Sequence, residues 1–457
     1  MLHPPLDREV MIKNDNPHFT RKNVEALAEW QGNPDWMRQA RLQYFELFEK
    51  LPMPGRRDEE WRKSDISKLA YDSYLPFLTD DRPAYSLDTL PSKFGIELPD
   101  EAQTNGLYLA VDGRQAYQRL AEELKSKGVI WTDMKTAVRE YPELVQKYFM
   151  RSVDENEENK FTALNAAFWN SGMFLYIPKN VDIELPLHMI NWFDSTKMVH
   201  NLHTLIVLEQ GASAVYFDEF ASAEKEQQAW VNSAIEIFVE DGARLQYISL
   251  QNLSGNVYNF AHRRARIGRD AVMNWLIGTF GSEFTKSTIS SILNGEGAET
   301  QMLGIAFGER NRFIDQHTHQ IHEAPHTRSD LLFKNAIMEG GRTVYRGVIR
   351  IAQHAQRSDA YQANRNLMLG DNARAESIPA LEIIANDVRC THGATVGKID
   401  PDQLFYLQSR GLSRPEAVQL LVRGFFFPVL QHIDQEYIAG RMNEIIEKRT
   451  ETVIDKI

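Results

Sequence analysis

Cysteine is almost absent from this chain, because Cys390 is the only one among 457 residues. A single thiol excludes an internal disulfide, and it also excludes an iron-sulfur site whose usual four or so thiolates all come from this chain. Long hydrophobic runs are missing as well. None reaches the roughly 18 residues that a membrane-spanning helix needs. We therefore predict a soluble protein.

Basic residues are also fewer than acidic ones. Lys and Arg number 51 against 63 Asp and Glu, which gives a net charge of -12. Nucleic acids and anionic membranes attract basic surfaces, so this balance argues against both as partners. The start, MLHPPLDREVMIKNDNPHFT, is polar where a secretory signal would carry an apolar core. We predict a cytoplasmic protein, in a reducing compartment that suits one unpaired cysteine.

Helical patterns dominate the first third of the chain. Apolar residues recur at three- and four-residue steps over 24–50, where we expect a helix, and similar patterns occur at 114–126 and 134–149. GLYLAVDG (106–113) predicts a short strand between them. The charged stretch RSVDENEENK then marks a boundary. We expect a mostly helical N-terminal region at 1–158.

Short alternating runs such as HTLIVLE and SAVYFDEF replace the helical patterns over 159–399, which predicts a mainly β core. Similar turn sequences carry evenly spaced alanines at 212, 243, 271 and 298, and Ala373 follows after a much longer gap. A repeat of about 30 residues is typical of a solenoid of stacked β coils. A β sandwich with similar turns is the alternative.

Residues 400–457 are predicted to form a C-terminal helical domain. PDQLFYLQSRG ends on Gly411, a common helix stop, and Ser413 and Glu416 have the spacing of a capping box for the next helix. A last stretch, DQEYIAGRMNEIIEKR, has an apolar face that needs a covering surface. That face carries Ile438, Met442, Ile445 and Ile446.

Two motifs suggest ligand sites and are weighed against simpler interpretations. GTFGSEFTKST approaches a phosphate-binding loop, but Thr285 stands where that loop requires its second glycine, so we exclude nucleotide binding there. DQHTHQIHEAPHTRSD holds His317, His319, His322 and His326. Strand alternation separates His322 from the first two, so a metal site would need a turn or a second strand. The alternative is scattered polar histidines near a turn.

Cys390 and His392 form an i, i+2 pair in DVRCTHGATVG. In an extended strand both side chains leave the same face with Cβ atoms roughly 7 Å apart, so they could share one ligand or metal. Their geometry suits a nucleophile and its base poorly. The simpler alternative is a buried, small apolar cysteine beside a surface histidine. If the pair serves iron-sulfur chemistry, the missing ligands must come from a partner chain.

Several segments resemble the SufB/SufD family of iron-sulfur cluster assembly scaffolds. The most specific segment is IPALEIIANDVRCTHGATVGKIDPDQLFYLQSRGLS, followed by EAVQLLVRGF. Further similar segments are APHTRSDLLFKNAI, AYQANRNLML, KFTALNAAFWNSGMFLYIPKNV and LPMPGRRDEEWRKSDIS. The element THGATVG resembles SufD, since SufB proteins carry an H-E-A-T element at this point.

The resemblance implies a right-handed parallel β-helix flanked by helical regions. It also implies a non-enzymatic scaffold that pairs with a SufB paralogue, or with itself when alone, and that binds the SufC ATPase through its C-terminal helices. Cys390 and His392 would lie at the SufB interface and share a transient iron-sulfur cluster with SufB thiolates, while the isolated chain holds no cofactor. The expected SufC-docking residues are Leu404, Phe405, Phe425, Phe426 and Phe427.

A carbohydrate-active β-helix enzyme is the alternative function. Such enzymes act in grooves lined by acids and arginines, and RSDAYQANRN offers Arg357, Asp359 and Arg365. A cytoplasmic acidic chain makes a pectin-type substrate a poor match.

Overall fold

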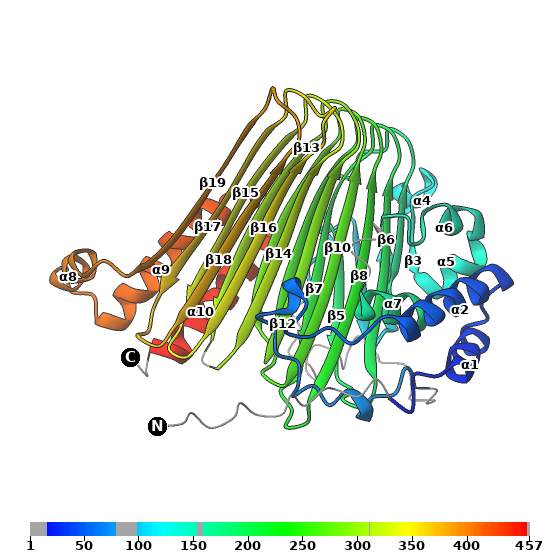
Figure 1. Cartoon of the computed structure of the whole chain (residues 1–457), viewed down its shortest axis with the longest axis horizontal. Helices are drawn as coiled ribbons and strands as arrows, with labels where there is room; N and C mark the ends of the chain where they lie inside the picture. The colour runs from blue at the N-terminus through cyan, green and yellow to red at the C-terminus, as the bar shows by residue number, and fades with distance from the viewer. Residues whose placement is uncertain (1–15, 79–97, 153–158, 310, 455–457) are drawn as a thin grey trace.

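The structure is a computed structural model that describes residues 16–78, 98–152, 159–309 and 311–454. Two sheets dominate it, and from β4 onward consecutive strands alternate between them (Figure 1). The ten-stranded sheet holds, in spatial order, β19 (Arg389–Lys398), β17 (Asp359–Met368), β15 (Arg328–Ile337), β13 (Glu299–Gly308), β11 (Val272–Gly281), β9 (Arg244–Leu253), β7 (Ser213–Ser222), β5 (Leu187–Phe193), β1 (Gly106–Val111) and β2 (Arg114–Leu120). The nine-stranded sheet holds β18 (Arg374–Ile383), β16 (Arg342–Ile351), β14 (Phe313–His322), β12 (Phe284–Leu293), β10 (Val257–Ile267), β8 (Ala229–Val239), β6 (Val199–Leu208), β4 (Met173–Ile177) and β3 (Ile130–Asp133).

Each coil consists of one strand from each sheet, and the strands of successive coils pair in parallel. Strands β2 and β3, at the N-terminal ends of the two sheets, pair antiparallel with β1 and β4. Phe284 lies beside Phe313, which lies beside Arg342. These pairings give each coil the length that the sequence repeat indicated. The result is a parallel β-solenoid of about eight coils. The predicted β-helix is confirmed, and the β-sandwich alternative is wrong because sandwich strands pair antiparallel.

Four of the five alanines in the sequence repeat occupy equivalent positions in the fold, and the fifth does not. Ala212, Ala243, Ala271 and Ala298 are buried, and each directly precedes a strand of the ten-stranded sheet. Ala373 instead precedes β18 of the nine-stranded sheet. Ala373 therefore does not continue the series, which explains why its distance from Ala298 along the chain matches no whole number of coils.

The N-terminal region corrects two expectations. The helix expected over 24–50 is two helices, α1 (Arg21–Gln31) and α2 (Asp35–Lys50), because Gly32 adopts a left-handed φ of 64° and Pro34 follows. Residues 114–120 form strand β2 rather than a helix. Asp112 and Gly113, with φ of 51° and 75°, make the two-residue turn that pairs β2 with β1.

The remaining N-terminal helices are short and lie at the first coils. They are η1 (Glu59–Trp61), η2 (Tyr71–Ser73), α4 (Glu122–Ser126), α5 (Met134–Glu140), α6 (Pro142–Tyr148) and α7 (Lys160–Phe168). Strands β1, β2 and β3 already belong to the two sheets, so the sheets begin before residue 158. No described helix is long and apolar enough to cross a membrane.

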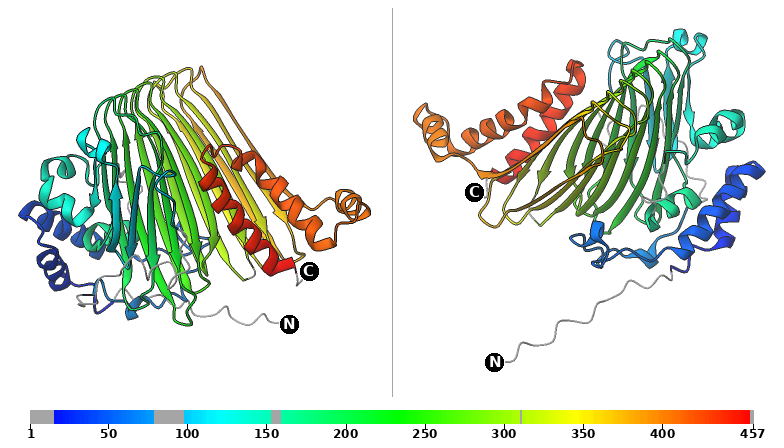
Figure 2. Two further views of the ribbon diagram at one scale, coloured as in Figure 1. Left: turned by 180° about the vertical axis from the view of Figure 1, so that it is seen from behind. Right: turned by 45° about the horizontal axis from the view of Figure 1, so that its top comes forward.

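Three C-terminal helices follow β19: α8 (Pro401–Ser409), α9 (Arg414–Leu430) and α10 (Glu436–Ile454). The predicted capping box of Ser413 and Glu416 is confirmed at the start of α9. Helices α9 and α10 lie across the outer face of the ten-stranded sheet (Figure 2). The predicted apolar face of α10 is confirmed, since Ile438 and Met442 are fully buried in this contact. Helix α8 buries no residue and projects from the body.

Candidate functional site

Among the described residues, no further strand follows the last coil of the solenoid. Strands β18 and β19 end the two sheets, so one edge of each has no partner among the described strands. Their side chains are unusually exposed for a sheet, and the apolar Ile383 of β18 and Val396 of β19 are 41% and 54% exposed. An uncovered edge with apolar side chains is a surface on which another chain can pair.

Cys390 and His392 lie on this edge strand and face the interior of the solenoid. Cys390 continues the ladder of the buried Ser329 and Ala360, and His392 continues the ladder of Leu331 and Gln362. The expectation that both side chains leave one face of an extended strand is therefore confirmed. Both are uncovered on the side where a further coil would stand.

The two side chains have different surroundings. Cys390 is half-buried and packs against the apolar cluster that contains Ile349, Ile351 and Ala360, whereas His392 is exposed. Burial, and then the negative charge of Asp359, raises the pKa of the Cys390 thiol to about 11. The thiol is therefore protonated at neutral pH in the isolated chain. A bound metal or a partner's positive charge would have to stabilise the thiolate.

The described part of the chain supplies no metal site of its own, since no three of its His, Cys, Asp and Glu side chains are grouped to hold a metal ion. His317 lies on the outer face of β14 beside Asp315, and His322 lies in the interior between Thr327 and Ser329. Burial lowers the pKa of His322 to about 4. His326 lies in a turn with φ of 59°. The scattered-histidine alternative is the correct one.

Lys286, from the rejected phosphate loop, is a structural residue. It lies on β12 and is buried, and its ammonium donates to Asp315 and to the carbonyl oxygen of Glu60. The ammonium is therefore buried and already bonded to other groups of the protein.

The expected docking residues divide between exposed and buried positions. Phe405 of α8 and Phe427 of α9 are 72% and 60% exposed, and Leu404 and Phe425 are half-buried. Phe426 is fully buried against the ten-stranded sheet, so it is removed from the docking set. Leu420, another apolar residue of these C-terminal helices, is also exposed. Sequence reasoning missed the exposed Tyr406, which directly follows Phe405.

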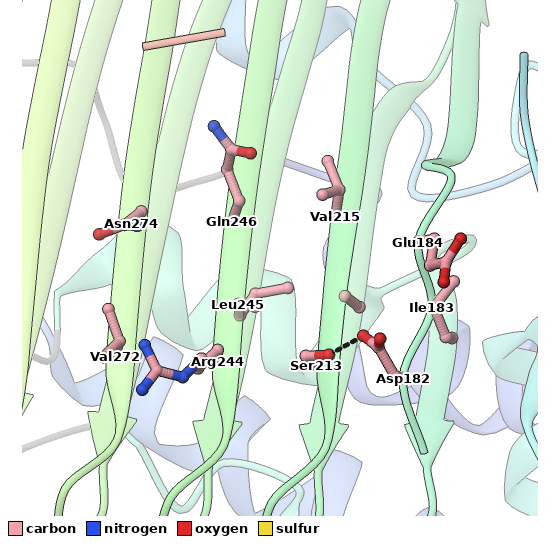
Figure 3. A pocket seen from close by; sticks show the side chains of 11 residues that line it. Asp182, Ile183, Glu184, Ser213, Val215, Arg244, Leu245, Gln246, Val272 and Asn274 are labelled. Carbon is pink, nitrogen blue, oxygen red and sulfur yellow. Dashed lines mark hydrogen bonds between the residues drawn. The ribbon is translucent and has the colours of Figure 1, made fainter. Parts of the chain in front are cut away.

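Two of the three residues proposed for an enzyme, Arg357 and Asp359, take part in exposed ion pairs. Arg357 lies 3.6 Å from Asp387, and Asp359 lies 3.9 Å from Arg389. A shallow cavity of about 280 Å³ lies elsewhere, on the outer face of the early coils (Figure 3). It is lined by Asp182, Ile183, Glu184, Ser213, Ala214, Val215, Arg244, Leu245, Gln246, Val272 and Asn274. None of the expected enzyme residues lines it, so this alternative is not favoured.

Comparisons with known proteins place the chain in a family. Residues 191–425 match the family model described as SUF system FeS cluster assembly, SufBD core domain, and residues 19–189 match the SufBD protein N-terminal region. Curated relatives from Staphylococcus haemolyticus, Staphylococcus epidermidis and Staphylococcus aureus are 31% identical over 449 residues. The alignments cover 96% of this chain and 95% of each relative. Each relative is described as an iron-sulfur cluster assembly SufBD family protein.

Proposed function

Because the chain belongs to the SufBD family of iron-sulfur cluster assembly proteins, we propose that it is a SufD-type scaffold subunit. Its last coil pairs with a SufB-type paralogue, and the two chains together complete the site where a cluster is assembled. The observation that carries this proposal is the position of Cys390 and His392. Both lie on the edge strand β19 and face the interior of the solenoid, and one edge of β19 has no partner among the described strands. The THGATVG element supports the SufD type.

The partner supplies what this chain lacks. A cluster usually needs about four ligands, and this chain offers one thiol and one imidazole at the last coil. The raised pKa of Cys390 indicates that its thiolate forms only when iron or a basic partner group lies beside it. The cluster is therefore the cargo of the paired subunits, and the isolated chain forms no cluster.

The C-terminal helices bind a SufC-type ATPase in this proposal. Helix α8 buries no side chain and carries Phe405 and Tyr406, and α9 adds Leu420 and Phe427 on its exposed side. Exposed aromatic and aliphatic side chains on helices are common anchors for a partner's groove. Helices α9 and α10 pack against the sheet that ends in β19. A movement of α9 by the ATPase would therefore be transmitted through this sheet to the strand that carries Cys390 and His392.

We expect Cys390→Ser and His392→Ala to reduce cluster formation with little loss of stability. Both side chains lie at an uncovered coil, so their removal disrupts little packing. The measurement is iron and acid-labile sulfide per complex after anaerobic coexpression with the SufB-type and SufC-type partners, alongside the urea unfolding midpoint. Cluster yield per folded complex that stays at the wild-type level in both variants would remove these residues from the site. Polysaccharide turnover by the isolated chain would instead favour the enzyme.

We also expect Cys390 to react slowly with iodoacetamide when the chain is alone. A pKa near 11 rather than 9 lowers the thiolate fraction at neutral pH about 100-fold, and the higher intrinsic nucleophilicity recovers about tenfold. The net alkylation rate should be about tenfold below that of a free thiol. Because Cys390 is the only cysteine, mass spectrometry reports this rate without interference. A rate equal to that of a cysteine-containing peptide would contradict the raised pKa.

A further inference from the structure

Gln362 lies beside the candidate cluster-assembly residue His392. The two residues are ladder partners on β17 and β19, and both face the interior of the solenoid. Neighbouring strands are about 4.8 Å apart, so in-register side chains on one face are immediate neighbours. Since β19 is the last strand of its sheet, Gln362 is the ladder neighbour of His392 on its one paired side. Gln362 is only 1% exposed, so a buried amide stands next in the ladder to an exposed histidine.

Hydrogen bonds tie this amide to the opposite sheet. The Tyr345 hydroxyl donates to the Gln362 side-chain oxygen at 3.3 Å. The Gln362 side-chain nitrogen donates to the carbonyl oxygens of Gly347 and Ala380, each at 3.4 Å. Tyr345 and Gly347 belong to β16, and Ala380 belongs to β18. One side chain therefore links β17 to both final strands of the nine-stranded sheet.

The absence of a side chain at Gly347 makes room for the hydrogen bond between Gln362 and Tyr345. A Cβ added to Gly347 would lie 2.1 Å from the Gln362 side-chain oxygen and 2.3 Å from the Tyr345 hydroxyl. Any residue other than glycine would displace both groups. The Tyr345 hydroxyl is held in turn by the Thr318 hydroxyl, 2.9 Å away on β14. The Gln362 amide is thus held directly by two strands of the opposite sheet, β16 and β18, and indirectly by β14 through Tyr345.

We propose that Gln362 is a positioning residue for the cluster-assembly site. By tying the two sheets together in the last covered coil, it fixes the spacing between β18 and β19 and supports the imidazole of His392. This inference rests on the proposed function for the role of His392, but the support of the imidazole is a property of the isolated chain. Residues that orient a metal ligand without binding the metal commonly change affinity or activity about 10- to 100-fold when they are replaced.

The test compares Gln362→Leu with Gln251→Leu. Gln251 is a matched control, since it is a buried interior glutamine of the same sheet that bonds Thr285 and Asn259 several coils before the last one. The first readout is the imidazole signal of His392 in the isolated chain, recorded by nuclear magnetic resonance with labelled histidine and assigned with His392→Ala. The second is cluster yield per folded complex with the SufB-type and SufC-type partners.

We expect Gln362→Leu to shift the His392 signal and to lower cluster yield about tenfold. Gln251→Leu should leave both at the wild-type values. Tyr345→Phe removes one bond to the amide and should shift the His392 signal less, and it replaces Gln362→Leu if that variant does not fold. An unchanged His392 signal in Gln362→Leu and Tyr345→Phe overturns the positioning role. Full cluster yield in His392→Ala overturns the proposed site instead, while the resonance measurement still decides the positioning role.

Discussion

Replacing Phe426 with alanine is expected to lower the free energy of unfolding by about 3–5 kcal/mol, which is the usual range for truncating a buried phenylalanine. The Phe426 side chain is fully buried in the cluster between α9 and the outer face of the ten-stranded sheet. Its removal leaves a cavity that the rigid sheet cannot close. The measurement is the urea unfolding midpoint at constant slope. A loss below about 1 kcal/mol would contradict the burial of Phe426.

Phe427→Ala is the matched control one residue later, and it tests a different property. Phe427 is mostly exposed, so its truncation should change stability by no more than about 0.5 kcal/mol. If Phe427 anchors the SufC-type ATPase, its loss should weaken binding by about 2 kcal/mol, or roughly 30-fold. Calorimetric titration with the ATPase measures this. Unchanged affinity in both Phe427→Ala and Phe405→Ala would remove these two side chains from the proposed ATPase contact.

Point substitutions test the docking surface more cleanly than a truncation after Gly397. Removing α9 and α10 would expose a large apolar area on the ten-stranded sheet, because these helices cover it. The uncovered residues would include Phe217, Ile248, Leu250, Leu276, Phe280, Leu303, Ile305 and Phe307. A truncated chain would therefore aggregate through this face, and loss of ATPase binding in it would not identify the contact.

Glu219→Gln is expected to destabilise the protein by about 3–5 kcal/mol, because it breaks a buried ion pair and leaves a positive charge without its partner. Glu219 is 1% exposed, and Arg441 of α10 donates to both of its carboxylate oxygens at 2.6 and 2.8 Å. Glu309→Gln is the control, since its pair with Arg449 also anchors α10 but is partly exposed. It should cost about 1 kcal/mol or less. An equal loss of unfolding free energy in the two variants would contradict the view that burial makes the Glu219–Arg441 pair the more costly one to break.

The same pair predicts how stability depends on pH. Burial alone would raise the pKa of Glu219, but His188 and Arg441 lower it to about 2. A carboxyl group whose pKa is lowered in the folded state stabilises the protein above its unfolded pKa of about 4.3. That contribution is lost as the pH falls from about 4 towards 2. We expect the difference in unfolding free energy between wild type and Glu219→Gln to shrink over this interval, as measured by urea unfolding at each pH.

Local features of the sequence predicted several parts of the fold correctly. The capping box at Ser413 and the apolar face of α10 depend on residues three to eight positions apart, so neighbouring residues determine them. The shared face of Cys390 and His392 follows from the two-residue period of any extended strand. The regular spacing of the turn alanines indicated coils, because each coil must supply similar turns.

Only the tertiary structure decided which residues meet across coils. Strand alternation is the same in a sandwich and in a solenoid, so it could not show that Gln362 pairs with His392, although the two are separated by about one coil of sequence. Nor could it show that Ala373 precedes a strand of the other sheet. Burial of Phe426 and exposure of Phe427 depend on which side of α9 meets the sheet. The local sequence determines which faces exist, whereas the packing of residues that are distant in the chain determines which faces are covered.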